Sequence, residues 1–147
     1  MTGTATPSGK LSAFLASPDR AGPYRLRPKQ GELLAEAARA QSLRLFALDL
    51  GSAADKTAWL AALGQGLGFP EWYGANFDAL YDCLTDGDWM PPQGCLLHLS
   101  GFTALGEEGT DTLIAILQAA ADEWREPGRP LWAALDAPGL DLDPLPA

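Results

Sequence analysis

Basic residues are absent from the middle of this sequence. Residues 57–124 contain no lysine or arginine but ten aspartate or glutamate residues, and the 147-residue chain carries a net charge of −9. A surface of one negative sign repels nucleic acids and anionic membranes and attracts basic proteins. Enzymes that act on phosphate groups usually place an arginine or lysine beside the reacting atoms, and this stretch supplies none. We therefore expect direct binding neither to nucleic acid nor to a membrane.

Side chains that often serve catalysis and metal binding are also scarce. The one histidine, His98, stands among leucines and is expected to be structural. The two cysteines, Cys83 and Cys95, are too few for a disulfide framework, and Cys83 is expected to be a buried free thiol. The sequence has no glycine-rich phosphate loop and no nucleophile elbow. We expect no enzymatic activity, no cofactor and no metal ion.

No apolar run reaches the length of a membrane span, and the first residues lack the apolar core of a secretory signal. We therefore expect a cytoplasmic protein. A chain of this length can bury one sizeable core, and no internal repeat divides it.

The hydrophobic pattern predicts strands that alternate with helices. Residues 43–50, 95–99 and 131–135 are mostly apolar runs of strand length, typical of buried parallel strands. Helices are expected from Asp55, from Asn76 and, after a break at residues 106–109, from Thr110 or Asp111. Because parallel neighbours need crossover connections, we expect an α/β fold with a three-stranded parallel sheet packed against helices.

The chain divides into three parts. Residues 1–42 are expected to form an N-terminal extension, partly disordered up to about residue 9, with a short strand at 24–27 and a helix at 32–40 packed on the domain. Residues 43–136 hold the three expected strands and form the main domain. Residues 137–147 contain three prolines and are expected to be a loose C-terminal tail.

The segment from Gly68 to Trp89 contains the most informative pattern. An aromatic loop with Trp72 and Tyr73 leads to Asn76, a residue type that commonly caps a helix N-terminus. Gly74, within this loop, is expected to be a turn residue with an unusual φ. The apolar residues that follow repeat at helical spacing and form one core-facing stripe: Phe77, Leu80, Tyr81 and Leu84.

The other face of this helix is acidic. Asp78 and Asp82 lie about one turn apart with Thr85 on the same face, and no basic residue relieves their charge. Large aromatic side chains in a loop are costly unless they are buried or contact a partner. Aromatic residues beside acidic ones therefore indicate a surface for a cationic partner, with an ordinary solvated helix face as the simpler alternative.

Residues 70–85, Pro-Glu-Trp-Tyr-Gly-Ala-Asn-Phe-Asp-Ala-Leu-Tyr-Asp-Cys-Leu-Thr, resemble the signature of the barstar family, intracellular inhibitors of the ribonuclease barnase. The resemblance is ungapped over these positions, and weaker similarity covers residues 43–136. It implies a three-stranded parallel sheet packed against helices. It also implies an immunity-type inhibitor that binds a basic ribonuclease in a 1:1 complex and blocks its active site with the acidic helix and the aromatic loop.

The resemblance also implies which residues form the inhibitory surface. Asp82 takes the place of a substrate phosphate and pairs with arginine, and Asp78 is a second charged contact. Trp72 and Tyr73 pack on the nuclease. The full set of expected partner-binding residues is Trp72, Tyr73, Gly74, Asn76, Phe77, Asp78, Tyr81, Asp82, Thr85 and Asp86.

The sequence departs from the family pattern around this helix. Trp72 stands where the family usually has tyrosine, and Asp86 replaces a glycine. Two residues, Gly87 and Asp88, are inserted before Trp89. These changes leave the identity of the target nuclease open.

Some implied roles have structural alternatives. Phe77 and Tyr81 can serve chiefly the core, and Asn76 chiefly the helix cap. An acidic contact on the family's last long helix aligns near Ala119, where the nearest acidic residues are Asp122 and Glu123.

Two other functions fit the same residues. Asp78 and Asp82 are close enough in sequence to share a divalent cation in a metal-dependent hydrolase, although their spacing matches no defined metal loop. The fold can also serve as a protein-binding scaffold for a partner that is not a nuclease.

Overall fold

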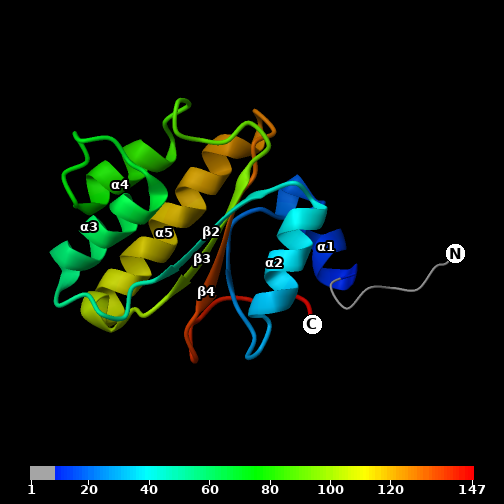
Figure 1. The fold of residues 1–147 in the computed structure, drawn as a ribbon, viewed down its shortest axis with the longest axis horizontal. Coiled ribbons are helices and arrows are strands. Elements are labelled where there is room, and N and C mark those ends of the chain that lie inside the picture. The colour runs from blue at the N-terminus through cyan, green and yellow to red at the C-terminus, as the bar shows by residue number, and fades with distance from the viewer. Residues whose placement is uncertain (1–8) are drawn as a thin grey trace, which may run out of the picture.

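A parallel sheet of four strands runs through the middle of the molecule (Figure 1). This computed structural model describes residues 9–147, so the disorder expected for residues 1–8 lies outside the described part. The strand order is β1-β4-β3-β2, and every pair is parallel. The strands are β1 (Pro23–Arg25), β2 (Arg44–Asp49), β3 (Cys95–Ser100) and β4 (Leu131–Asp136). The α/β fold with a parallel sheet is confirmed.

The predicted number of strands is wrong, because the sheet has four strands rather than three. The additional strand, β1, comes from the N-terminal part and pairs with β4, where Tyr24 lies opposite Ala134. It is only three residues long. So few residues carry too little alternation to show which strand they join, and the sequence pattern therefore does not place β1 in the sheet.

Helices cover both faces of the sheet (Figure 1). The chain order and the right-handed rule for parallel strand–helix–strand connections explain this arrangement. The connections from β2 to β3 and on to β4 cross the sheet in one direction, whereas the connection from β1 to β2 crosses it in the other. One face therefore packs against α3 (Lys56–Leu67), α4 (Phe77–Leu84) and α5 (Gly106–Arg125), and the other against α1 (Gly9–Leu15) and α2 (Gly31–Ala40).

The two central strands are buried on both faces, which explains their continuous apolar sequences. In β3, Leu97 and Leu99 belong to the core beneath α3, α4 and α5, whereas Leu96 belongs to the core beneath α1 and α2. In β4, Trp132 and Ala134 join Leu96 in that second core. Two short 3-10 turns, η1 (Pro18–Arg20) and η2 (Thr103–Leu105), lie in the connections.

The longest helix, α5, begins earlier than the sequence predicts. It starts at Gly106 and includes the residues expected to form a break. Gly109 is buried inside it, where an added Cβ would lie 3.1 Å from the Cβ of Leu105, so this glycine permits close packing rather than a turn. The Thr110 hydroxyl donates to the Gly106 carbonyl at 2.7 Å and is not a helix cap. None of the described helices is long and apolar enough to cross a membrane.

The C-terminal residues differ from the loose tail that their prolines predict. Leu145 is buried, with 1% of its surface exposed. The Arg25 amide donates to the Asp143 carbonyl at 2.9 Å, and the Leu145 amide donates to the Arg25 carbonyl at 3.0 Å. The tail therefore lies along the free edge of β1, and Leu145 adds to the second core.

We expect Leu34→Ala in α2 to lower the free energy of unfolding by about 2–5 kcal/mol, the usual cost of emptying a fully buried leucine site. Leu34 is 0% exposed in the core that α2 shares with Trp132. Urea denaturation measures the change, with Leu33→Ala as the control, because Leu33 is only partly buried in the same helix. A loss below about 1 kcal/mol for Leu34→Ala would mean that α2 lies outside the cooperative core.

Candidate protein-binding site

Helix α4 is fixed at both ends by side chains of its own sequence. The Asn76 side-chain oxygen Oδ1 accepts the Ala79 backbone amide at 2.8 Å, which is the expected N-cap. At the other end the Thr85 hydroxyl donates to the Tyr81 carbonyl at 2.8 Å. The residues of the helix that are buried in the core are Leu80, Cys83 and Leu84.

The acidic face of α4 is open to solvent. Both Asp78 and Asp82 are exposed. The N-terminal helices lie across the sheet from α4 and do not cover this face (Figure 1). Among the described residues the ion pair found is Arg125–Asp122 on α5, so the carboxylates of α4 have no basic partner there. The repulsion between them is therefore relieved only by solvent.

Phe77 and Tyr81 lie at the boundary between the core and the surface, as their alternative roles imply. Both are partly buried. The Lys56 ammonium group lies 5.8 Å from the centroid of the Phe77 ring. Partial burial raises the pKa of the Tyr81 phenol, and the Glu123 and Asp82 carboxylates raise it further. The Tyr81 hydroxyl is thus a neutral donor beside acidic groups.

The aromatic loop before α4 presents one ring outward and holds the other inward. Trp72 is 56% exposed and is the exposed large apolar side chain of the described residues. Tyr73 instead donates its hydroxyl proton to the Leu60 carbonyl of α3 at 2.8 Å and packs edge-on against Phe69 at 5.0 Å. The Tyr73 amide also bonds to the Pro70 carbonyl at 3.0 Å, which closes a turn around Trp72. Tyr73 therefore anchors the loop, and the Trp72 ring is left exposed to solvent.

The unusual backbone angle of this loop falls on Ala75 rather than on Gly74. Ala75 has a φ of 52°, whereas Gly74 is not among the residues with positive φ. A left-handed conformation at a residue with a Cβ is uncommon and costs energy. Space around Gly74 is instead limited, because an added Cβ would lie 3.0 Å from the side-chain nitrogen Nδ2 of Asn76. The glycine thus leaves room for the helix cap.

After α4 a second turn brings two more carboxylates to the aromatic loop. The Asp86 carboxylate accepts the Asp88 amide at 2.8 Å. Trp89 then packs on the domain: its indole N–H donates to the Leu67 carbonyl at the end of α3 at 2.7 Å, and its ring stacks on Phe46 at 6.0 Å. Trp72, Asp86, Asp88 and Trp89 share one pocket. The structure therefore brings the aromatic loop and the residues that follow α4 to one pocket.

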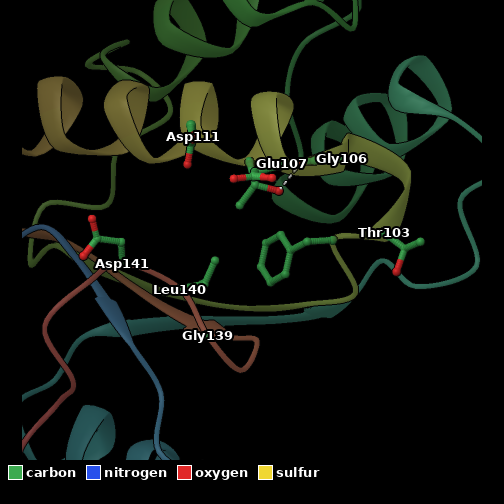
Figure 2. Close-up of a pocket in the computed structure, with 9 residues that line it drawn as sticks. Thr103, Gly106, Glu107, Asp111, Gly139, Leu140 and Asp141 are labelled. Atoms are coloured by element: carbon green, nitrogen blue, oxygen red, sulfur yellow. Dashed lines mark hydrogen bonds between the residues drawn. The ribbon is translucent and has the colours of Figure 1, made fainter.

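A separate pocket lies at the start of α5, beside the chain that follows β4, and is shown in Figure 2. Its volume is about 390 Å³, and its acidic side chains are Glu107 and Asp111 from α5 and Asp141 from the segment after β4. None of the expected partner-binding residues lines it. Across the described residues, no group of three or more histidine, cysteine, aspartate or glutamate side chains is placed to hold a metal ion.

Comparison with known proteins decides the family. The sequence model of the family described as Barstar (barnase inhibitor) matches residues 43–136. The chain belongs to the barstar family. Comparison with curated proteins gives no significant match. The barstar-family range begins just before β2 and ends with β4, so β1, α1 and α2 are additions outside it.

Of the two acids that the sequence leaves open on the last long helix, one lies beside Tyr81. Glu123 on α5 is exposed and close enough to Tyr81 to raise the pKa of its phenol. Its neighbour Asp122 is committed elsewhere, because Arg125 binds it at 2.7 Å and Gln118 at 3.0 Å. Asp122 and Glu123 follow the aligned Ala119 by three and four residues, so helical spacing places both on the same side of α5 as Ala119. Only the packing of α4 on α5 shows that Glu123 is the acid beside Tyr81.

We expect Gly64→Ala to disturb the loop of this barstar-family protein without touching its carboxylates. An alanine Cβ at Gly64 would lie 2.3 Å from the Tyr73 ring, so the ring must move and its bond to Leu60 weakens. The free energy of unfolding should fall by about 1–3 kcal/mol, as for other overpacked sites. Chemical denaturation measures this, and Ala61→Gly on the exposed side of α3 is the control, because it gives the alanine–glycine helix-propensity difference of about 1 kcal/mol without a clash. Unchanged stability would mean that Tyr73 is not an anchor.

We expect stability to fall more steeply between pH 9 and pH 11 when Cys83 is present. Burial, with help from Asp86 and Asp82, raises the pKa of the Cys83 thiol from 9.0 to about 11. In that range the unfolded chain loses a proton that the folded chain keeps, so stability present below pH 9 is lost as the pH rises. The loss should be on the order of 1–2 kcal/mol.

The measurement is urea denaturation at several pH values for the natural chain and for Cys83→Ala. The variant should show a shallower pH dependence, because the other titrating groups, including buried Cys95, are the same in both. Equal slopes would contradict the raised pKa.

Proposed function

We propose that this barstar-family protein inhibits a basic ribonuclease by placing the acidic face of α4 and the aromatic loop in its active site. The observation that carries the proposal is the position of Asp78 and Asp82. Both carboxylates are exposed on a helix fixed at both ends, and neither has a basic partner among the described residues.

The chemistry of a ribonuclease active site supports this role. Such a site must hold the polyanionic backbone of RNA with cationic side chains. A carboxylate at Asp82 can pair bidentately with an arginine that otherwise binds phosphate. The acidic stretch around it attracts a basic enzyme over longer distances and speeds the encounter. A rigid helix also loses little conformational entropy when it binds.

The remaining residues fit around this charged centre in the proposed complex. Trp72 offers an exposed indole, and tryptophan is among the residues that contribute most to protein interfaces. Tyr81 offers a neutral hydroxyl between Asp82 and Glu123. Asn76, Gly74 and Thr85 shape the surface through the cap and the turn.

In this proposal the protein is an inhibitor and not an enzyme. It binds its nuclease in a 1:1 complex and does not itself bind RNA. Its place would be the cytoplasm, where an immunity protein protects the cell's own RNA. The absence of basic residues from 57–124 supports a protein partner over a nucleic-acid partner.

We expect Asp82→Ala to weaken the complex by several kcal/mol. This is the size found for a desolvated charge at the centre of an interface, for which the barnase–barstar complex is itself the standard example. The test is inhibition of RNA hydrolysis by a panel of bacterial ribonucleases with basic active sites, including barnase. Asp111→Asn is the control, because it removes an exposed carboxylate from α5, at the pocket of Figure 2, and leaves the acidic face of α4 unchanged.

The salt dependence of association and the stability of the variant are two further measurements. Association with the inhibited nuclease should slow as salt rises, because the Debye length shrinks from about 10 Å at 0.1 M to about 3 Å at 1 M. Folding should be unaffected by Asp82→Ala, since the side chain is exposed. Inhibition of no ribonuclease at micromolar concentration would overturn the proposal and favour a partner that is not a nuclease.

A further inference from the structure

Beside the acidic helix lies a pocket that the family pattern does not supply. It has a volume of about 460 Å³ and is lined by Gly68, Pro70, Trp72, Asp86, Asp88 and Trp89. Asp86 replaces the family's glycine, and Asp88 belongs to the two inserted residues. The pocket therefore combines two indole rings with two carboxylates, and the resembled family pattern supplies neither carboxylate.

One indole of the pocket is fixed by the domain. Trp89 is partly buried, and its N–H donates to the Leu67 carbonyl at the C-terminus of α3. Its ring lies between Phe46, at 6.0 Å, and Phe69, at 5.4 Å. These contacts leave Trp89 little freedom to rotate, so the ring is a rigid wall.

The carboxylates are held by the turn that carries them. Asp86 accepts the Asp88 amide at 2.8 Å, which orients the Asp86 carboxylate. Arg129 binds the same turn from the main-chain side, donating to the Gly87 carbonyl at 3.1 Å and to the Met90 carbonyl. Its guanidinium carbon also lies 4.7 Å from the Trp124 ring. Arg129 thus stabilises the turn through its main-chain carbonyl groups. It forms no ion pair with Asp86 or Asp88, since the ion pair found among the described residues is Arg125–Asp122.

The other basic group near the pocket is engaged by an aromatic ring. Arg44 lies 4.8 Å from the centroid of Phe46, and Phe46 in turn stacks on Trp89. Neither carboxylate forms an ion pair among the described residues, and the second indole, Trp72, is 56% exposed. The pocket therefore presents unneutralised negative charge beside an apolar ring that the fold leaves uncovered.

We propose that this pocket receives an arginine side chain of the nuclease. The inference rests on the proposed function and names a second cation-binding position beside Asp82. A guanidinium group is planar, stacks on an indole and pairs with a carboxylate through two parallel hydrogen bonds. A lysine ammonium offers only a point charge, and an uncharged side chain would leave both carboxylates desolvated without a partner. The indoles and carboxylates together match the guanidinium.

The first test uses a small probe and needs no nuclease. In ¹⁵N spectra of the whole chain, N-acetyl-arginine amide should shift the indole signals of Trp72 and Trp89. N-acetyl-citrulline amide, its neutral isostere, should shift them little. Asp86→Asn with Asp88→Asn should abolish the arginine effect while keeping the turn, because asparagine retains the oxygen that accepts the Asp88 amide. Asp82→Asn should leave it intact.

The second test uses the nuclease that the chain inhibits. The Asp86→Asn, Asp88→Asn double variant should bind it roughly 30-fold more weakly, as for loss of a close interfacial charge pair. Glu107→Gln with Asp111→Asn removes the same number of charges from the pocket of Figure 2 and should change binding little. Replacing the cognate arginine of the nuclease should abolish the difference between the double variant and the natural chain in a double-mutant cycle.

The outcomes separate the pocket from the proposed function. Equal shifts with the citrulline probe, or shifts that survive the double variant, would overturn the arginine assignment while inhibition by Asp82 stands. Full affinity of the double variant for an inhibited nuclease would do the same. If no ribonuclease is inhibited but the arginine probe shows the expected pattern, the proposed function fails and the pocket's preference for guanidinium is retained.

Discussion

The site depends on hydrogen bonds that fix two helix C-termini. The last carbonyl groups of a helix have no partner within it. The Trp89 indole N–H supplies one to Leu67 at the end of α3, and the Trp124 indole N–H supplies one to Leu84 at the end of α4, at 2.8 Å. A helix of eight residues is unstable in isolation. Tertiary bonds of this kind, together with the buried face of α4, are what allow it to present carboxylates rigidly.

The two faces of the sheet divide the structure into a layer that carries the proposed binding surface, here called the recognition layer, and a supporting layer. The recognition layer consists of α3, α4 and α5, which carry the acidic and aromatic residues. The supporting layer consists of α1 and α2, which bury Leu96 and Trp132 on the opposite face. Arg125 links the layers, since its guanidinium binds Asp122 on α5 and the Ala21 carbonyl in the N-terminal part. The additions to the barstar-family range thus complete the core without covering the acidic face.

Much of the fold and part of the site could be predicted because their signals are local. The Asn76 cap, the apolar stripe of α4 and the continuous strands β3 and β4 each follow from a short pattern in the sequence. The place of β1 in the sheet and the bonds of the C-terminal tail could not, because they depend on partners distant in sequence. The early start of α5 was missed for a different reason: glycine is read as a break, whereas Gly109 is buried inside the helix and Leu105, one turn earlier, packs closely against it.

The candidate site shows the same division. The residue types and the helix periodicity indicate the acidic face, but they give Trp72 and Tyr73 the same role. Only the contact of Tyr73 with Leu60 and Gly64 shows that one ring anchors the loop and the other is free. The sequence also leaves open whether Asp122 or Glu123 lies beside α4, because the approach of Glu123 to Tyr81 comes from the packing of α4 on α5.

The exposed ring of Trp72 has a practical consequence for spectroscopy. The chain has five tryptophans. Trp59, Trp124 and Trp132 are buried, so their emission reports a shielded environment, and Trp89 is partly buried at the edge of the pocket beside Trp72. Trp72 alone emits from a site exposed to water. The molecule therefore carries an intrinsic fluorophore at the surface that we assign to its partner. A shift in the emission wavelength of Trp72 would report the loss of water from that surface when the partner binds.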